Sequence, residues 1–441
     1  MKTAPISKSI ADKLGVFSSK TQQRVAAGRG VTAAALASLW LFGCAHPAPQ
    51  APTQSAAPPA PQAAAAPPPL PPILPMDQAV LNAANGVFTT ASKLPLETPP
   101  GRTVVIDPLV DGVIGYQSKA TQDIGERIAG LVHSDYPRFA VAPFSPATLQ
   151  QAPLVLVGTF TPVNASNNQP TGPREAYRFC LVLGDLQTGK IVAKAVARAR
   201  VEDVDATPTA VFRDSPVWTP DASTKAYIAT CQASKVGDPI NKQFLDGLLG
   251  ASLVGEAGEA YEHGKYEDAL RLYGNAAETP AGDQLRVYNG LYLANYKLGR
   301  RDSATEAFHN LVAYGFRNDR VAVKFLFEPN SARFSPEVAM SNQYDMWLQQ
   351  IAEQGAASPA CIEVSGHTSP TGSPALNDRL SFLRADYVKS RLEADAPALH
   401  DRVIANGVGS RENLVGTGKD DASDALDRRV ELKLIPKCTN S

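Results

Sequence analysis

A run of 31 residues, 45–75, is the feature that most constrains how this 441-residue chain folds. It contains twelve Pro and ten Ala, and no Asp, Glu, Lys or Arg. Proline fixes φ and removes a backbone donor, so we expect an extended polyproline II segment with no core of its own. At ~3.1 Å per residue the run spans on the order of 95 Å. We assign residues 45–76 as a disordered Ala/Pro-rich tether; a plain interdomain linker is the alternative.

Residues 1–44 have the pattern of an export signal. Six Lys or Arg precede residue 30 against a single acid, and an apolar stretch from Val31 to Phe42 leads to Gly43 and Cys44. A basic segment, an apolar segment and a small residue before the cut define a secretory signal. The final Cys resembles that of a bacterial lipoprotein signal, which implies that Cys44 is lipidated. An ordinary signal peptide or a short buried helix is the alternative.

The lipoprotein resemblance also implies a location. Ala45 and His46 follow the Cys, where an Asp is the usual signal for retention in the inner membrane. We therefore expect a chain anchored by lipid to the outer membrane, on its periplasmic side, without spanning it. No apolar run reaches the roughly 18 residues that a spanning helix needs.

The bulk composition excludes other classes of protein. There are 42 Lys plus Arg and 43 Asp plus Glu, so the formal net charge is −1. A nucleic-acid-binding protein carries a basic excess or stripe, so we expect no nucleic-acid partner. The length predicts about three domains. The fold class that we expect is multidomain α+β.

Residues 77–239 are expected to form a small α/β domain. The pattern predicts strands at 102–107, 139–144 and 154–160, a helix over 119–134, and a hairpin of 177–183 and 191–201 around Gly184 to Gly189. This order resembles the periplasmic lipoprotein domain of the curli-secretion and penicillin-binding-protein-activator type. The resemblance covers about 100 residues, from Thr103 to Glu202, and implies a role in protein–protein contact.

Residues 240–318 contain a helical repeat. Gly264, Tyr266, Ala269, Tyr273 and Ala276 recur 35 residues later as Gly299, Arg301, Ala304, Phe308 and Leu311. The spacing resembles that of tetratricopeptide repeats, whose period is 34. Two repeats are few for a solenoid, so we expect neighbouring elements to cover their ends. The pair is either a protein-binding groove, with a protein partner bound through residues 77–318, or a structural spacer.

Residues 319–437 carry the most specific motifs. These are Phe325-x-Phe327, Gly366-His-Thr, Gly372, Asn377, Leu380-Ser-x-x-Arg384-Ala, Val388, Gly407-x-Gly409 and Arg428-Arg-Val-Glu. Together they strongly resemble the OmpA-like peptidoglycan-binding domain. The resemblance implies an α/β sandwich with a mixed sheet that binds a peptidoglycan stem peptide. We expect strands within 323–334 and at 361–368, 403–409 and 427–434, and helices over 340–353 and 377–392.

The candidate site lies on the second of these helices. Asn377, Ser381 and Arg384 are four and three residues apart and share one face. A second stripe is expected to face the core: Leu376, Leu380, Leu383, Tyr387 and Leu392. The loop 366–372 enters the helix at its N-terminus, which favours anions.

Arginine suits a carboxylate because its guanidinium donates two parallel hydrogen bonds. The resemblance implies that Arg384 holds the carboxylate of the diamino acid in the stem peptide. It also implies that Asn377 orders the loop or contacts the peptide. The predicted peptidoglycan-binding residues are Thr368, Ser369, Gly372, Asn377, Arg384 and Arg428.

Ser369 departs from the family pattern, which usually has Asp directly after Gly-His-Thr. A serine accepts a hydrogen bond but carries no charge, and charge-assisted hydrogen bonds contribute ~1.5–3 kcal/mol against ~1 for neutral ones. The loss corresponds to binding that is weaker by roughly ten-fold or more. The alternative is a domain that keeps the fold and has lost the ligand. His367 has the residue type of a catalytic base, but we interpret it as a structural loop residue.

The cysteines indicate disulfides rather than a metal site. With Cys44 lipidated, four remain, and an exported location permits disulfides. Two lie in each of two domains, so Cys180–Cys231 and Cys361–Cys438 are the economical pairs. No Cys-x-x-Cys, His-Glu-x-x-His, Gly-x-Ser-x-Gly or phosphate loop is present, so we expect no metal, no cofactor and no enzymatic activity.

The sequence therefore predicts a non-catalytic lipoprotein of the outer membrane that binds peptidoglycan non-covalently and tethers the envelope to the cell wall. One alternative is a scaffold or regulator of an envelope or cell-wall assembly machine, with a degenerate wall-binding site. Another is an enzyme that acts on the wall.

Overall fold

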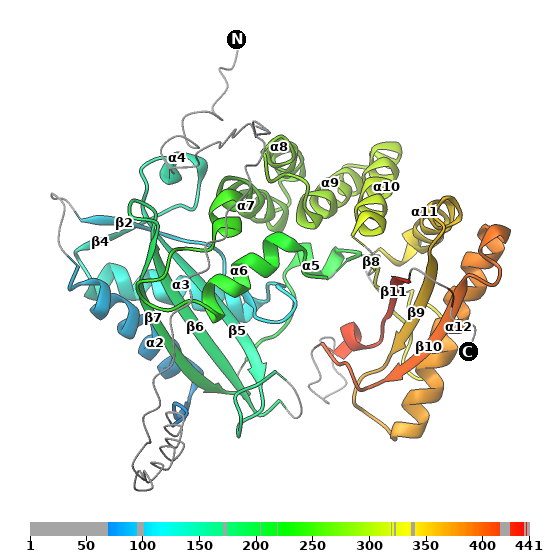
Figure 1. Ribbon diagram of the computed structural model, residues 1–441, viewed down its shortest axis with the longest axis horizontal. Coiled ribbons are helices and arrows are strands. Elements are labelled where there is room, and N and C mark those ends of the chain that lie inside the picture. Colours follow the sequence, from blue (N-terminus) through cyan, green and yellow to red (C-terminus); the bar gives the residue numbers. More distant parts are fainter. Residues whose placement is uncertain are drawn as a thin grey trace, which may run out of the picture.

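The computed structural model describes residues 69–94, 101–170, 174–202, 204–217, 219–318, 320–321, 323–336, 340–414, 424–435 and 438. A large sheet lies at one end, a row of helices leads away from it, and a smaller sheet lies at the other end (Figure 1). The export signal, Cys44 and most of the tether lie outside the described residues. Within the described part, no helix combines the length and apolar character needed to cross a membrane.

The large sheet has seven strands in the order β1-β7-β6-β5-β2-β4, with β3 paired to β5. Its strands are β1 (Ile73–Leu74), β2 (Arg102–Ile106), β3 (Val110–Asp111), β4 (Phe139–Ala142), β5 (Leu154–Val163), β6 (Ala176–Asp185) and β7 (Lys190–Arg200). The predicted hairpin is confirmed: β6 and β7 are antiparallel, and Gly189 closes the turn with φ +68°. A positive φ carries little steric penalty in glycine, which has no Cβ.

The tether prediction is wrong at its C-terminal end. Ile73 and Leu74 pair in parallel with Arg198 and Ala199 of β7, so they belong to the sheet. Helix α2 (Met76–Ala91) follows directly and buries a row of mostly small side chains against β7 and β6. Gly86 of this helix faces Ala195, where a Cβ would lie 3.0 Å from the alanine methyl. Small residues thus let α2 pack closely on the strands, and neither β1 nor α2 was predicted.

Helices cover both faces of the large sheet. One core contains α2, α3 (Lys119–Asp135) and one side of β5 and β6. The other contains the opposite side of those strands, α6 (Ala222–Gln232) and the first turns of α7. Two shorter helices complete this part of the chain, α4 (Pro146–Leu149) and α5 (Ala210–Asp214).

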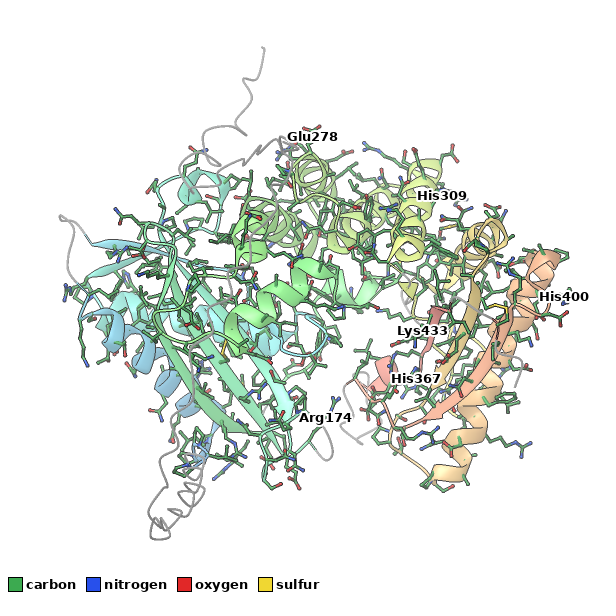
Figure 2. All side chains as sticks on the ribbon, viewed as in Figure 1. Arg174, Glu278, His309, His367, His400 and Lys433 are labelled. Atoms are coloured by element: carbon green, nitrogen blue, oxygen red, sulfur yellow. A yellow bond between two sulfur atoms is a disulfide. The ribbon has the colours of Figure 1, made fainter. Side chains whose placement is uncertain are left out.

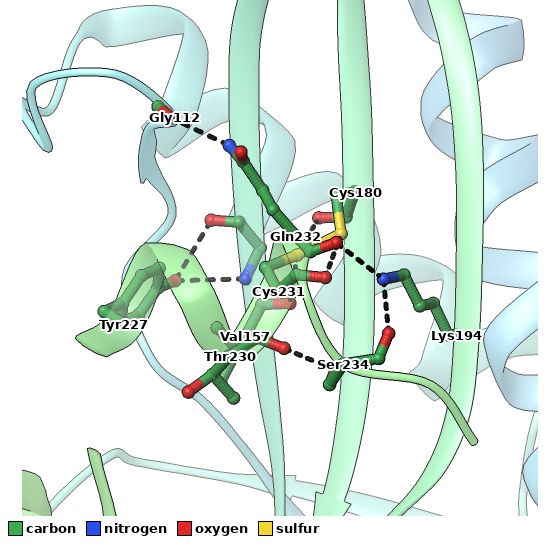
Figure 3. The surroundings of a disulfide bond; sticks show 10 residues. Gly112, Val157, Cys180, Lys194, Tyr227, Thr230, Cys231, Gln232 and Ser234 are labelled. Carbon is green, nitrogen blue, oxygen red and sulfur yellow. Dashed lines mark hydrogen bonds between the residues drawn. A yellow bond between two sulfur atoms is a disulfide. The ribbon is translucent and has the colours of Figure 1, made fainter. Parts of the chain in front are cut away.

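A disulfide joins Cys180 of β6 to Cys231 of α6, the pairing expected from the sequence. Both cysteines are buried, and hydrogen bonds between α6 and the strands surround them (Figure 3). The hydroxyl of Tyr227 accepts from the backbone N–H of Gly158 at 3.0 Å, and Lys194 Nζ donates to the carbonyl of Ser234 at 2.6 Å. The disulfide therefore fixes α6 to the middle of the sheet.

Four helices follow as two antiparallel hairpins. They are α7 (Lys242–Glu262), α8 (Tyr266–Ala277), α9 (Leu285–Lys297) and α10 (Arg301–Arg317). Gly264 and Gly299 lie at equivalent turns, each with φ +72°. Three further matched positions are buried in both hairpins: Ala269 with Ala304, Tyr273 with Phe308, and Ala276 with Leu311. The matched pair of Tyr266 and Arg301 differs, since the tyrosine is half-buried and the arginine exposed. The repeat in the sequence thus corresponds to a repeat in packing.

The C-terminal part contains a four-stranded mixed sheet in the order β10-β9-β11-β8. Its elements are β8 (Arg320–Val321), η1 (Ser341–Gln343), α11 (Tyr344–Ala357), β9 (Cys361–His367), α12 (Pro374–Asp395), η2 (Pro397–Leu399), β10 (Val403–Gly409), η3 (Asp424–Asp427) and β11 (Val430–Ile435). Strands β9 and β10 are parallel, whereas β11 is antiparallel to β9 and to β8. The second disulfide joins Cys361 at the start of β9 to Cys438, again as expected.

Some predicted boundaries in this part are wrong. The segment 323–334 was expected to open as a strand and then turn; the turn is present, but in place of a strand Val323 makes an isolated bridge to Val217, and Phe327 bridges Phe334 across the turn. Helix α12 begins three residues earlier than predicted, because Ser373 caps it by accepting from the backbone N–H of Leu376. Proline at position 374 suits the first helical turn, where no intrahelical N–H bond is needed.

The helical hairpins and the smaller sheet share one apolar core. Trp347 of α11 lies at their junction, where it stacks on Phe308 of α10 with centroids 5.5 Å apart and an interplanar angle of 10°. Its indole Nε1 donates to the hydroxyl of Tyr292 of α9 at 2.7 Å. Helix α11 therefore covers the end of the second hairpin.

Candidate functional site

The predicted binding loop lies between the end of β9 and the start of α12. Thr368 continues the pairing of β9, since its backbone N–H donates to the carbonyl of Gly409 at 2.9 Å. The loop then turns at Gly372, whose φ of +96° is rarely adopted by residues with a side chain. Ser373 ends the loop as the N-cap of α12.

Two glycines bring α12 unusually close to the sheet. A Cβ at Gly366 of β9 would lie 1.9 Å from the carbonyl oxygen of Ser381, and one at Gly407 of β10 would lie 2.8 Å from that of Asp378. No other residue type fits at this spacing without moving the helix. The Gly366-His-Thr and Gly407-x-Gly409 motifs therefore determine how closely the helix approaches the loop.

The predicted orientation of α12 is wrong. Asn377, Ser381 and Arg384 face the sheet and are buried, whereas Leu376, Leu383 and Tyr387 are exposed. Leu380 is half-buried, and Leu392 alone of the predicted apolar stripe is buried as expected. The polar residues can face inward because backbone groups satisfy them. Ser381 Oγ donates to the carbonyl of Asp378 at 2.8 Å and accepts from the N–H of Gly409 at 2.9 Å.

Arg384 lies at the centre of the site and is fully buried. Its guanidinium donates to three backbone carbonyls: Nη2 to Glu328 at 3.0 Å, Nε to Ser331 at 3.0 Å and Nη1 to His367 at 3.2 Å. The guanidinium also lies over the ring of Phe327, with Cζ 5.2 Å from the centroid. The tight turn between Phe327 and Phe334 therefore covers the arginine that was expected to face a ligand.

The positive charge of Arg384 is balanced by dipoles rather than by an acid. Within the described residues its partners are the three carbonyls and the aromatic ring. Burial, with a further contribution from the positive charge of Arg428, lowers the pKa of Arg384 to about 10. The guanidinium remains charged at neutral pH, so the site is a buried cation beside a second, half-buried one. Such a site favours an anion, because an opposite charge offsets the cost of desolvation.

The loop itself is fastened to α12 by Asn377. The Asn377 side-chain amide donates to the carbonyl of Ser369 at 3.4 Å, which supports its predicted role in ordering the loop. The Ser369 hydroxyl is hydrogen-bonded to that of Thr371 at 2.9 Å. Thr368 Oγ1 is buried and has no hydrogen-bond partner within the described residues. The structure thus brings together five of the predicted residues: Thr368, Ser369, Gly372, Asn377 and Arg384. The sixth, Arg428, lies near enough for its charge to lower the pKa of Arg384.

His367 is buried at the end of β9, and neither ring nitrogen has a hydrogen-bond partner among the described residues. Burial, with a smaller effect from the charge of Arg429, lowers the pKa of His367 to about 3. A neutral, enclosed imidazole is consistent with the structural role that the sequence suggested. Its backbone carbonyl, rather than its ring, contacts Arg384.

One contributor to the site was not predicted from the sequence. Arg174, two residues before β6 of the large sheet, donates to the carbonyls of Asn413 and Leu414. Figure 2 shows this arginine on the side of the large sheet that faces the C-terminal part. Asn413 Nδ2 in turn donates to the carbonyl of Thr368 at 2.8 Å. No local pattern reveals this link, because its residues are 240 positions apart.

Apolar side chains reinforce the same contact. Tyr116 and Leu426 form a small buried cluster, against which Ile114, Phe212 and Leu414 pack. Three of these residues come from the N-terminal half and two from the segment beside the binding loop. Segments that follow the strands of the two sheets are therefore in direct contact next to the site.

Known proteins are similar to the C-terminal part of the chain, which holds this site. Residues 326–426 match the OmpA family. This segment is an OmpA-like domain. Over 99 residues the chain is 37% identical to outer membrane porin F from Pseudomonas fluorescens, a match that covers 22% of this chain and 29% of the porin. The match thus spans less than a third of that relative, and the rest of the chain lies outside it.

Solved structures match over the same region. The peptidoglycan-associated lipoprotein from Burkholderia pseudomallei is 26% identical, covering 25% of this chain and 89% of that chain, with a TM-score of 0.23. The cell wall anchor of the T6SS from Pseudomonas aeruginosa is 23% identical, covering 28% of this chain and 91% of that chain, with a TM-score of 0.21.

Proposed function

We propose that the chain binds peptidoglycan non-covalently through its OmpA-like domain and anchors the cell envelope to the wall. The observation that carries this proposal is the buried cationic site at Arg384, which has no acidic partner within the described residues. A peptidoglycan stem peptide presents carboxylates and a free amine on an extended chain. Its carboxylate would supply the missing countercharge.

Binding in this way requires the turn around Ser331 to move. Two of the three carbonyls that Arg384 contacts, those of Glu328 and Ser331, belong to this turn. A carboxylate that enters the site replaces two neutral acceptors by one charged acceptor, and charge-assisted bonds are roughly twice as strong. Arg428 adds a second positive charge at the same place. The closed turn and the uncharged Ser369 both imply weaker binding. A site whose arginine is not covered, and which has Asp at the position of Ser369, would bind more tightly.

The proposed location rests on the sequence. A lipid on Cys44 would hold the chain at the periplasmic side of the outer membrane, and the Ala/Pro-rich segment would separate the folded body from the membrane. The non-catalytic role is likewise a proposal. It is supported by the absence of catalytic motifs from the sequence and by the OmpA-like domain, whose curated relative is a porin.

Competition with stem peptides tests the proposed ligand. Purified sacculi are sedimented with residues 45–441 in the presence of soluble stem peptide, either with the diamino-acid carboxylate free or with it amidated. We expect the free acid to release the protein from the pellet and the amidated peptide to leave it there. Equal release by both peptides, or protein that never pellets, would exclude a carboxylate-reading site at Arg384.

A second candidate function is a protein-interaction scaffold, with a wall-binding site that no longer binds. It is favoured by a hollow of about 460 Å³ on the first helical hairpin, between α7 and α8. The hollow is lined mainly by charged side chains, including Glu256, Glu259, Lys265, Asp268 and Arg271. Such a surface suits a polar peptide. A photo-crosslinking residue in place of Leu272, compared with one in place of the distant Lys225, tests whether a partner occupies the hollow in the envelope.

A further inference from the structure

The outward face of α12 is apolar and largely exposed within the described residues, although Tyr387 at its edge packs on Phe334. Leu376, Phe382, Leu383 and Tyr387 are exposed by 49%, 46%, 43% and 36%. Within the described residues nine large apolar side chains are exposed, and four of them lie on this one helix. Single exposed apolar residues are ordinary, but a contiguous group on one element marks an interaction surface. The helix lies at the outer edge of the molecule, away from the large sheet (Figure 1).

Two opposite charges lie within this apolar face. Arg379 and Asp386 are exposed, and Leu383 lies between them at spacings of four and three residues, so all three share one side of the helix. The two charged residues are seven positions apart, or about 10.5 Å along the axis at 1.5 Å per residue, which is too far for them to pair. Neither has an ion-pair partner within the described residues.

This arrangement is self-complementary. If a second copy of α12 lies antiparallel across the first, with the two-fold axis between Phe382 and Leu383, residue 379 of each helix faces residue 386 of the other. Arg379 then pairs with Asp386 of the second copy, twice, while the phenylalanine and leucine side chains meet at the centre. Two-fold interfaces use the same patch on both subunits, as this geometry requires.

We propose that the outward face of α12 is a homodimer interface, built on Leu383 and Phe382 and aligned by reciprocal Arg379–Asp386 ion pairs. The charge pattern favours a second copy over an unrelated partner, because both signs occur on the same face at positions that antiparallel pairing matches. One helix face is smaller than the roughly 800 Å² per partner of a stable interface, so the association is weak in solution.

The interface has a consequence for wall binding, which rests on the function proposed above. Each binding loop lies at the N-terminus of its α12, about nine residues from the two-fold axis. Antiparallel pairing therefore places the two loops at opposite ends, on the order of 30 Å apart along the helix axis. A dimer presents two wall-binding sites, and two linked weak sites bind a repetitive polymer much more tightly than one.

A charge-swap experiment tests the interface. Sedimentation equilibrium is measured over a wide concentration range for residues 45–441 as wild type, Arg379→Asp, Asp386→Arg and the double variant. We expect a weak monomer–dimer equilibrium, at least ten-fold weaker association in each single variant, and restored association in the double variant. Arg301→Asp, an exposed arginine on α10, is the matched control and leaves the equilibrium unchanged.

The proposal is overturned if the wild type stays monomeric at every concentration. It is also overturned if the single variants associate like the wild type, or if the double variant is as weak as the single ones. Melting temperatures of all five proteins, the Arg301→Asp control included, establish that each is folded. The substituted side chains point away from the sheet and the binding loop. A monomeric variant that pellets with sacculi as strongly as the wild type would therefore show that pairing does not strengthen wall binding, while the proposed binding loop would stand.

Discussion

Arg384 Nη2 donates to the backbone carbonyl of Glu328 at 3.0 Å, and this bond links the expected ligand-binding arginine to the turn that covers it. The turn is short and closed by the Phe327–Phe334 bridge. The salt bridge between Arg333 and Glu328 that fastens it on the outside is mostly exposed and contributes little to stability. The cover over the site is held by its hydrogen bonds to Arg384 and by the packing of Phe327 and Phe334 in the apolar core. A carboxylate that binds the arginine therefore removes the polar part of this attachment and leaves the aromatic part in place.

Restoring the family's acid should strengthen wall binding. Ser369→Asp places a carboxylate in the loop beside the cationic site, where it can pair with the amine of a stem peptide. We expect binding to sacculi to strengthen by roughly ten-fold, the difference between a charged and a neutral hydrogen bond. The measurement is the dissociation constant from co-sedimentation. Ser365→Asp, on β9 but outside the loop, is the control and should bind like the wild type.

His367 should make the domain sensitive to acid. Its pKa is lowered to about 3 in the fold, against about 6.5 in the unfolded chain, so protonation favours unfolding. The stabilising effect of the neutral ring is complete above pH 6.5 and decreases as pH falls towards 3. Each pH unit in this window costs about 1.4 kcal/mol. We expect His367→Phe, which removes no hydrogen bond of the ring, to flatten the pH dependence of the free energy of unfolding below pH 6.5. If the free energy of unfolding of the variant keeps the same slope against pH, groups other than His367 cause the acid sensitivity.

Trp347 should couple the helical hairpins to the OmpA-like domain. The indole is buried between α10, α9 and the sheet, so Trp347→Ala removes a stacked contact and a hydrogen bond at once. We expect a loss of about 3–5 kcal/mol in the free energy of unfolding. Because the core is continuous, tyrosine fluorescence of the hairpins and peptide circular dichroism should report the same weakened transition. Two separate transitions in the wild type would contradict a shared core.

Arg174 should hold the binding loop from the other half of the chain. Arg174→Ala removes both donors to the carbonyls of Asn413 and Leu414, and with them the support of the Asn413–Thr368 hydrogen bond. We expect faster hydrogen exchange at the backbone N–H of Thr368 and Leu414, with the strands of the large sheet unaffected. Arg178→Ala is the control, since that side chain donates within its own domain to Asn168. Equal hydrogen exchange at Thr368 and Leu414 in the two variants would show that Arg174 does not stabilise the loop.

The local features of this fold follow from sequence patterns, whereas the orientation of α12 does not. Helical spacing correctly separated Asn377, Ser381 and Arg384 from the leucine stripe. Hydrophobicity then assigned the wrong stripe to the core. The reason is that Gly366 and Gly407 bring the helix backbone against the sheet, where backbone groups satisfy inward-facing polar side chains. The leucines are left outside, where a second copy would cover them.

Contacts between distant segments were likewise invisible in the sequence. Ile73 and Leu74 read as part of a proline-rich tether because the strand that they form is only two residues long and depends on β7 for all its pairing. The link from Arg174 to Asn413 joins segments with no shared pattern. The cysteines are the exception: with two in each of two domains, the economical pairing is the one found in the structure.

The most direct test of the central claim is co-sedimentation with purified sacculi of the wild type, Arg384→Ala and Arg317→Ala, all as residues 45–441. Arg317 is an exposed arginine on α10, far from the loop, and controls for loss of one positive charge. Circular dichroism at the assay temperature establishes that each variant is folded. We predict that the wild type and Arg317→Ala pellet with the wall while folded Arg384→Ala stays in the supernatant. Folded Arg384→Ala that pellets like the wild type would contradict the account.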